Sequence, residues 1–127
     1  MAHANDPSAR IVYRFTQGKL KDVTPEFCSE IENERHFPKP TVASLEHLKN
    51  SKIDSGQFES LDDERTAGRV MSLVLHNLFC RRFANALDLI RRAWPREDQP
   101  NLIKRLKEEM SSDHDCPMCA EAIEKWR

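Results

Sequence analysis

The sequence predicts an all-α protein, built as a small irregular helical bundle around one long central helix. A short extended arm is expected at its N-terminal end, and a zinc-stapled helix at its C-terminal end. Apolar residues recur at helical spacing over most of the chain, and only 3 glycines and 7 prolines interrupt its 127 residues. A chain of this length is expected to form one domain with one modest core.

The N-terminal end differs from the rest. Residues 1–9 are expected to be a flexible tail, because small and polar residues cannot bury enough surface to offset the entropy of ordering. Residues 10–127 are expected to form a single helical domain. Within it, residues 10–16 alternate β-branched and aromatic side chains, which predicts one short strand before a turn at 17–19. A lone strand would lie on the helices as an arm, or would pair with another chain.

Two short helices are expected next. Thr24 and Pro25 are typical of a helix start, and this first helix is expected to reach about residue 36. A second short helix is predicted over residues 41–50, and residues 51–60 are expected to form a loop.

The central prediction is a long helix over residues 61–94. Ser60 and the acidic residues after it form a good helix start, and no breaker stronger than Gly68 occurs before Pro95. The predicted helix is much longer than the average of about 11–12 residues, so it would bend near Gly68 or cross the whole domain.

The C-terminal part is expected to contain two more helices. Asp98 and Pro100 start a helix whose apolar side chains recur every four residues. A CxxC knuckle follows at residues 114–119, and residues 120–127 form a closing helix.

Four residues are predicted to bind one zinc ion. His76 and Cys80 lie one helical turn apart on the apolar face, so both side chains can reach the same metal. Cys116 and Cys119 have the two-residue spacing of a metal-binding knuckle. Together they would form a closed Cys₃His site with one structural zinc per chain, joining the long helix to the C-terminal segment.

Other interpretations of these residues stay open. His114 and Cys28 are rival ligands, and His76 with Cys80 would otherwise be ordinary core residues. A third interpretation makes the chain a thiol redox protein at Cys116 and Cys119, although the strand context usual for such proteins is missing.

Two surfaces are candidates for binding macromolecules. An apolar stripe on the long helix is a candidate partner or homodimer interface, with burial inside the bundle as the alternative: Val70, Val74 and Leu78. A basic helical surface would bind RNA or DNA, with a solvated helix face as the simpler interpretation: Arg81, Arg82, Arg91, Arg92, Arg96, Lys104, Arg105 and Lys107.

The composition excludes several classes of function. The net charge of −1 is far from that of a protein that coats nucleic acid with its whole surface. Neither a membrane-spanning run nor a secretory segment is recognisable, so we expect an intracellular protein, cytoplasmic or nuclear. The sequence has no phosphate-binding glycine loop, no nucleophile elbow and no evident small-molecule site. The expectation is therefore a non-catalytic regulatory or adaptor protein that binds a protein partner or itself, with nucleic acid as the alternative ligand.

Overall fold

The computed structural model describes residues 8–54, 56–113, 115–116 and 118–127, and in this part of the chain it is mostly helical, as predicted. The N-terminal elements are β1 (Tyr13–Thr16), β2 (Lys19–Asp22), the 3-10 helix η1 (Thr24–Phe27) and α1 (Cys28–Glu32). They are followed by α2 (Val42–Lys49), β3 (Ile53–Asp54), β4 (Gln57–Phe58), α3 (Leu61–Phe79), α4 (Phe83–Ala93), the 3-10 helix η2 (Arg96–Asp98), α5 (Gln99–Ser112) and α6 (Cys119–Lys125). Within these ranges, the apolar stretches of the helices are too short to cross a membrane.

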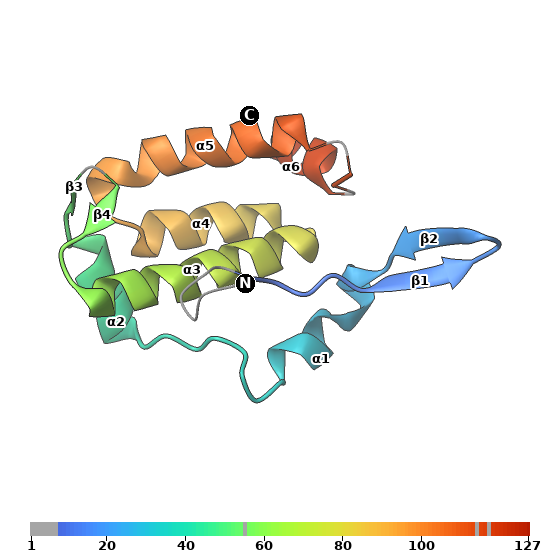
Figure 1. The fold of residues 1–127 in the computed structure, drawn as a ribbon, viewed down its shortest axis with the longest axis horizontal. Helices are drawn as coiled ribbons and strands as arrows, with labels where there is room; N and C mark the ends of the chain where they lie inside the picture. The colour runs from blue at the N-terminus through green and yellow to red at the C-terminus, as the bar shows by residue number, and fades with distance from the viewer. Residues whose placement is uncertain (1–7, 55, 114, 117) are drawn as a thin grey trace.

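The molecule has two parts, which we call the N-terminal arm (residues 8–37) and the helical core (residues 42–126). The β1–β2 hairpin of the arm projects away from the helices (Figure 1). The main cluster of buried apolar side chains extends from Leu48 to Trp126 and lies entirely in the helical core. The buried apolar residues of the arm lie outside that cluster: Val23, Cys28 and Ile31.

The centre of the helical core is the antiparallel pair α3 and α4 (Figure 1). Val70, Val74 and Leu78 of α3 are at most 1% exposed, and Ala86 and Ile90 of α4 are fully buried. The stripe expected to meet a partner is therefore covered by the chain's own helices. This corrects the interface prediction in favour of the intramolecular bundle.

The predicted single helix over residues 61–94 is wrong, because the chain turns back after Phe79. Cys80 ends α3, and Arg81 adopts the left-handed conformation with a φ of 64°. The Arg81 N–H bonds to the Leu78 carbonyl at 3.0 Å, and the Arg82 N–H to the Asn77 carbonyl at 2.8 Å. These are the two hydrogen bonds of a Schellman motif, which usually has glycine at the left-handed position.

The expected lone strand is half of a hairpin. β1 pairs antiparallel with β2, and the two turn residues, Gln17 and Gly18, have φ values of 53° and 77°. Two consecutive positive φ values are typical of a type I′ turn, whose twist matches that of the flanking strands. The arm thus supplies its own second strand, which the sequence prediction missed.

The other elements differ from expectation mainly in length. The first predicted helix is limited to η1 and α1, and the predicted loop over residues 51–60 contains the small β3–β4 sheet. α2 begins where expected, because the Thr41 hydroxyl caps it by accepting from the Ser44 N–H at 3.1 Å. Trp126, at the end of α6, connects this helix to α4, because its buried indole N–H donates to the Phe83 carbonyl at 2.9 Å.

Candidate metal centre

Three buried side chains from the two parts of the molecule meet where α3 ends. Cys28 begins α1, His76 lies in the last turn of α3, and Cys80 follows that helix. Their ligand atoms lie within 4.8 Å of one another, and none of the three residues is more than 7% exposed. Two thiols and an imidazole form a donor set that could hold a metal ion.

One spacing in the cluster, that between Cys80 and His76, is close to the spacing of two ligands in a tetrahedral zinc site. The Cys80 Sγ lies 3.6 Å from Nε2 and 3.8 Å from Nδ1 of His76. Zn–S bonds of about 2.3 Å and Zn–N bonds of about 2.0–2.1 Å place a sulfur and a nitrogen about 3.5 Å apart in tetrahedral geometry. The imidazole and the Cys80 thiol are therefore already near ligand spacing.

The structure joins Cys28 to Cys80 by a disulfide, with their Cα atoms 6.2 Å apart. A metal needs both sulfurs as thiolates, so the disulfide and the metal are alternative states of the same pair. Binding zinc would require reduction, and the sulfurs would separate from a bond of about 2 Å to about 3.8 Å.

Glu32 is a neighbour of this site that the sequence prediction did not name. Its Oε2 lies 2.7 Å from the His76 Nε2 and also accepts from the Arg82 guanidinium. Burial raises the pKa of the Glu32 carboxyl, but the hydrogen bonds from His76 and Arg82, together with the electrostatic attraction of these two side chains, outweigh burial and lower the net pKa. A carboxylate held on one imidazole nitrogen orients the ring, and Nδ1 is then the nitrogen left for a metal.

The predicted partners of His76 and Cys80 lie elsewhere. Cys116 and Cys119 form a separate disulfide, with their Cα atoms 5.5 Å apart. The cluster of Cys28, His76 and Cys80 is the only such group found among the described residues, and neither C-terminal cysteine belongs to it. The predicted four-ligand set is therefore not assembled in this structure. Of the rival ligands, Cys28 is in the cluster, and His114 lies outside the described residues.

Two surface hollows are candidate ligand sites. A pocket of about 390 Å³ borders His76 and is lined mainly by the arm and the residues after it, including Arg10, Glu34 and Phe37. The Phe37 ring packs edge-on against the imidazole, with the centroids 4.8 Å apart. His76 is the member of the cluster that lines this pocket.

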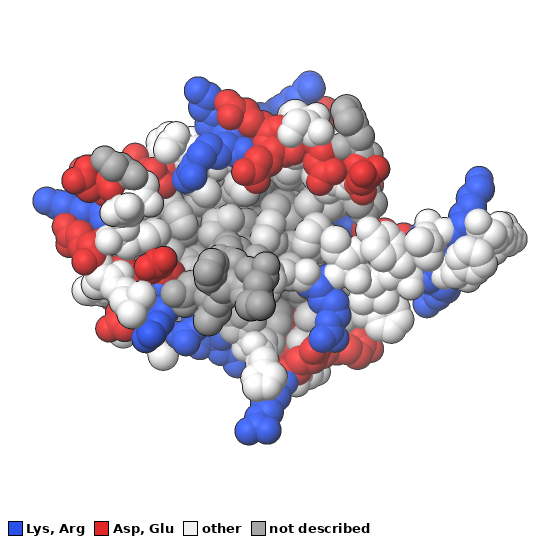
Figure 2. All heavy atoms as spheres, in the orientation of Figure 1, with Lys and Arg blue, Asp and Glu red and all other residues white. Residues whose placement is uncertain are grey.

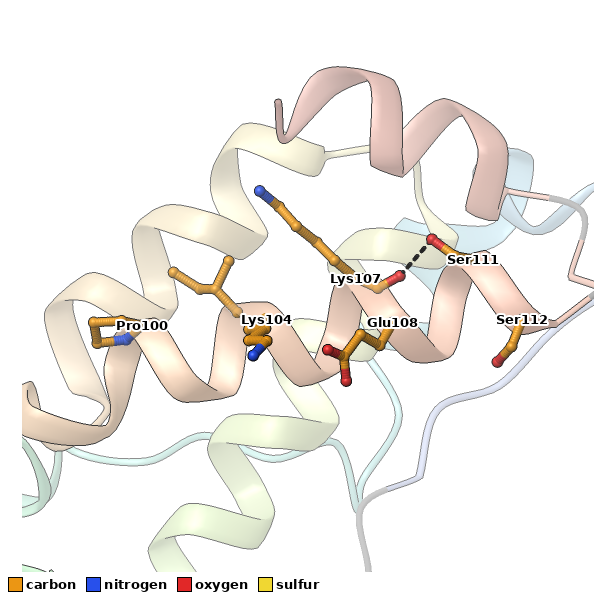
Figure 3. Close-up of a pocket in the computed structure, with 7 residues that line it drawn as sticks. Pro100, Lys104, Lys107, Glu108, Ser111 and Ser112 are labelled. Atoms are coloured by element: carbon orange, nitrogen blue, oxygen red, sulfur yellow. Dashed lines mark hydrogen bonds between the residues drawn. The ribbon is translucent and has the colours of Figure 1, made fainter.

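The second hollow, of about 700 Å³, lies on the outside of α5 (Figure 3). α5 alone supplies every lining residue, and Figure 3 shows Lys104, Lys107 and Glu108 extending from the same helix. The Ser111 hydroxyl donates to the Lys107 carbonyl at 2.8 Å, so it is already satisfied within the helix. This hollow is a stretch of helix surface, without a cysteine or histidine.

Half of the predicted basic surface is engaged within the chain. The ion pairs are Arg81 with Asp22, Arg82 with Glu32, Arg92 with Asp88 and Arg105 with Asp98. The other four cations make no ion pair within the described part of the chain: Arg91, Arg96, Lys104 and Lys107. The sequence pattern therefore overstated the free positive charge of this surface.

The chain matches no protein-family model, and the comparisons with curated proteins and with solved structures find no match either.

Proposed function

We propose that this chain is a non-catalytic regulatory or adaptor protein that binds a protein partner through the β1–β2 hairpin. We further propose that one structural zinc ion, held by Cys28, His76 and Cys80 in the reduced chain, fixes the N-terminal arm on the helical core.

The exposed apolar face of the hairpin carries the proposal. Tyr13, Phe15 and Leu20 are 47%, 71% and 69% exposed. Phe15 pairs directly with Leu20, and Tyr13 lies two residues along β1 on the same face. Large apolar side chains grouped on an exposed, projecting element are typical of a binding surface, because leaving them in water is unfavourable.

The zinc proposal follows from the donor set. Thiolate and imidazole ligands favour zinc over calcium and magnesium, which take oxygen ligands. The ion would connect α1 to the end of α3, and its binding energy would stabilise an arm that has little apolar core of its own. We place its role in structure because the three donors are nearly fully buried. Structural zinc sites are four-coordinate, so the proposal requires a fourth ligand that closes the site.

The hairpin proposal is tested by crosslinking and quantitative mass spectrometry of the tagged full chain in the cells that make it. The double variant Phe15→Ser/Leu20→Ser should lose the partner by more than about tenfold, because buried interface anchors contribute about 2 kcal/mol or more. Val42→Ser is the matched control, since Val42 is 73% exposed but lies on α2. The proposal would be contradicted if the wild type, the double variant and the Val42→Ser control all recovered the same partner equally.

RNA or DNA binding by the basic helical surface is the alternative, with less support because four of its eight cations are paired within the chain. A nucleic-acid complex would weaken steeply with salt, since each phosphate contact releases counterions. Binding to the apolar face of the hairpin would change little over the same salt range.

A further inference from the structure

We infer that the hairpin receives an extended segment of its protein partner as a third β-strand, and that apolar and acidic residues alternate along that segment. This inference rests on the proposed function and adds the chemistry of the partner. It follows from the register, the open edges and the charges of the hairpin.

The hairpin has two chemically different faces. The strand register pairs Phe15 with Leu20 and Arg14 with Lys21, and directly paired residues point to the same face. One face therefore carries the exposed apolar side chains Tyr13, Phe15 and Leu20. The opposite face carries Thr16 and three cations: Arg14, Lys19 and Lys21. Figure 2 shows the hairpin as a largely white surface with blue side chains that project above and below it.

Both outer edges of the hairpin are open. Its sheet has two strands in the described part of the chain, so each strand has one unpaired side. At the hairpin base the Val23 N–H donates to the Val12 carbonyl at 2.8 Å. In an antiparallel pair of strands, every second residue along each strand bonds to the other strand, and the backbone groups of the residues between them point away from it. The backbone groups of Tyr13, Phe15 and Leu20 consequently point outward. An open row of this kind is the usual template for an added strand.

The charges specify the residues that such a strand would carry. Successive residues of an added strand point alternately to the two faces of the sheet. Those on the apolar face would meet Tyr13, Phe15 and Leu20, and those on the other face would meet the cations. Lys19 and Lys21 make no ion pair with the described residues, and the Arg14 pair with Glu26, at 3.5 Å, is more than half exposed on both sides. Acidic side chains are therefore the complement.

A second copy of the hairpin is a poor occupant of the same edge. Pairing two hairpins edge to edge would bring the lysines and arginines of one copy close to those of the other. Like charges across neighbouring strands are destabilising. Cations along an edge strand are a known means of preventing such self-pairing.

The base of the hairpin is held rigid, which favours strand addition. The Thr24 hydroxyl accepts from the Val12 N–H at 2.9 Å, and the nearly buried Asp22 carboxylate accepts from Arg81 at 3.0 Å. The type I′ turn fixes the other end. A pre-organised template loses less conformational entropy when a segment binds.

The inference is tested with a short labelled peptide of alternating valine and glutamate, titrated into the full chain and followed by fluorescence anisotropy. Two other peptides serve for comparison. One has the same composition with its valines and its glutamates in separate blocks, and the other alternates valine with lysine. Each should bind at least about tenfold more weakly, equivalent to about 1.4 kcal/mol. Amide exchange at Tyr13, Phe15 or Leu20 should slow in the complex.

Charge reversal on the hairpin supplies the matched variants. Lys19→Glu/Lys21→Glu should exchange the preference, so that the lysine peptide binds more tightly. Lys104→Glu/Lys107→Glu, on α5, should leave the preference as it is. Any of three results would overturn the inference. The three peptides could bind equally well, the hairpin variant could keep the preference of the wild type, or the valine–glutamate peptide could bind without slowing amide exchange. The proposed function would fail separately, if the partner crosslinked in cells were retained by Phe15→Ser/Leu20→Ser.

Discussion

The helical core and the N-terminal arm are stabilised by different interactions. The core is held by one continuous apolar cluster, which includes the fully buried Leu48, Val70 and Ile90. The arm has few buried apolar residues, and it is attached by polar and covalent contacts that we call the clamp. The clamp consists of the Asp22–Arg81 ion pair, the Cys28–Cys80 pair, and Glu32 with His76 and Arg82.

The difference shows where the molecule can be regulated. Apolar burial is insensitive to pH, redox state and metal ions near neutrality. The clamp depends on all three, because it contains thiols, an imidazole and carboxylates. Every part of the clamp reaches residues 76–82, so the arm is attached at the end of α3 and the turn that follows it.

The largest effect is expected from a cavity in the core. Trp94 is 5% exposed, packs edge-on against Phe58 and donates to Asp98 at 2.8 Å. Trp94→Ala should lower the free energy of unfolding by about 3–5 kcal/mol, measured in urea. Ile31→Ala, in the arm, should mainly speed amide exchange within the arm. A comparable global loss in both variants would contradict the separation into two parts.

The second-largest effect is the loss of unfolding free energy when either disulfide of the oxidised chain is removed. The Cys28–Cys80 bond closes a loop with a sequence separation of 52, whereas Cys116–Cys119 has a separation of 3. Loop-closure entropy predicts a loss of about 4 kcal/mol for Cys28→Ser and about 2 kcal/mol for Cys116→Ser. Denaturation of the two oxidised variants measures this, and a larger loss for Cys116→Ser would be inconsistent with the clamp.

A smaller effect is expected at Asp22, with a defined pH dependence. Burial raises the pKa of this carboxyl, but the hydrogen bonds from Thr24 and Arg81, with the charge of Arg81, outweigh burial and bring the pKa below its ordinary value. A carboxyl whose pKa is lowered by folding stabilises the protein above its unfolded pKa, and this contribution is lost as the pH falls through the folded value. Asp22→Asn should therefore cost about 2 kcal/mol at neutral pH.

The difference in stability between wild type and Asp22→Asn should shrink as the pH falls below the ordinary pKa of an aspartate carboxyl, because the folded-state pKa of Asp22 lies lower still. Glu26→Gln is the control, because its ion pair with Arg14 is exposed and should contribute almost nothing at any pH. A loss for Asp22→Asn that does not change with pH would show that the carboxylate charge is not responsible.

The smallest effect concerns backbone strain at Arg81, whose φ is 64°. Arg81→Gly relieves this strain but also removes the ion pair with Asp22, so the two changes should nearly cancel in the wild-type chain. In an Asp22→Asn background the same substitution should stabilise by about 1 kcal/mol. A urea double-mutant cycle checks this, and destabilisation in both backgrounds would contradict it.

The helical content and most apolar faces could be predicted from the sequence, but the break between α3 and α4 could not. A Schellman motif normally shows itself by glycine, and here Arg81 occupies the left-handed position. The Arg81 guanidinium donates locally to the Phe79 carbonyl and, across the fold, to Asp22; the tertiary contact with Asp22 helps to hold a conformation that local propensity disfavours. The hairpin had a stronger signal, since Gln17-Gly18 separates two strand-like segments.

Two of the three residues of the candidate metal centre could be predicted together, because helical spacing alone brings His76 and Cys80 to the same face. The CxxC spacing then suggested the wrong partner for them. Cys28 joins them instead because the arm folds back on the end of α3, with Glu32 meeting His76 and Arg82. A contact between residues so distant in sequence leaves no periodic signal.

The most direct test of the account is the metal content of the reduced chain, measured by elemental analysis after purification with a reductant. We predict one zinc per chain, retained by Cys116→Ser and lost from Cys28→Ser and His76→Ala. Loss of the metal should also speed amide exchange in the arm while leaving α3 and α4 protected. Absence of zinc from the reduced wild type, or retention by Cys28→Ser with loss from Cys116→Ser, would contradict the proposed clamp.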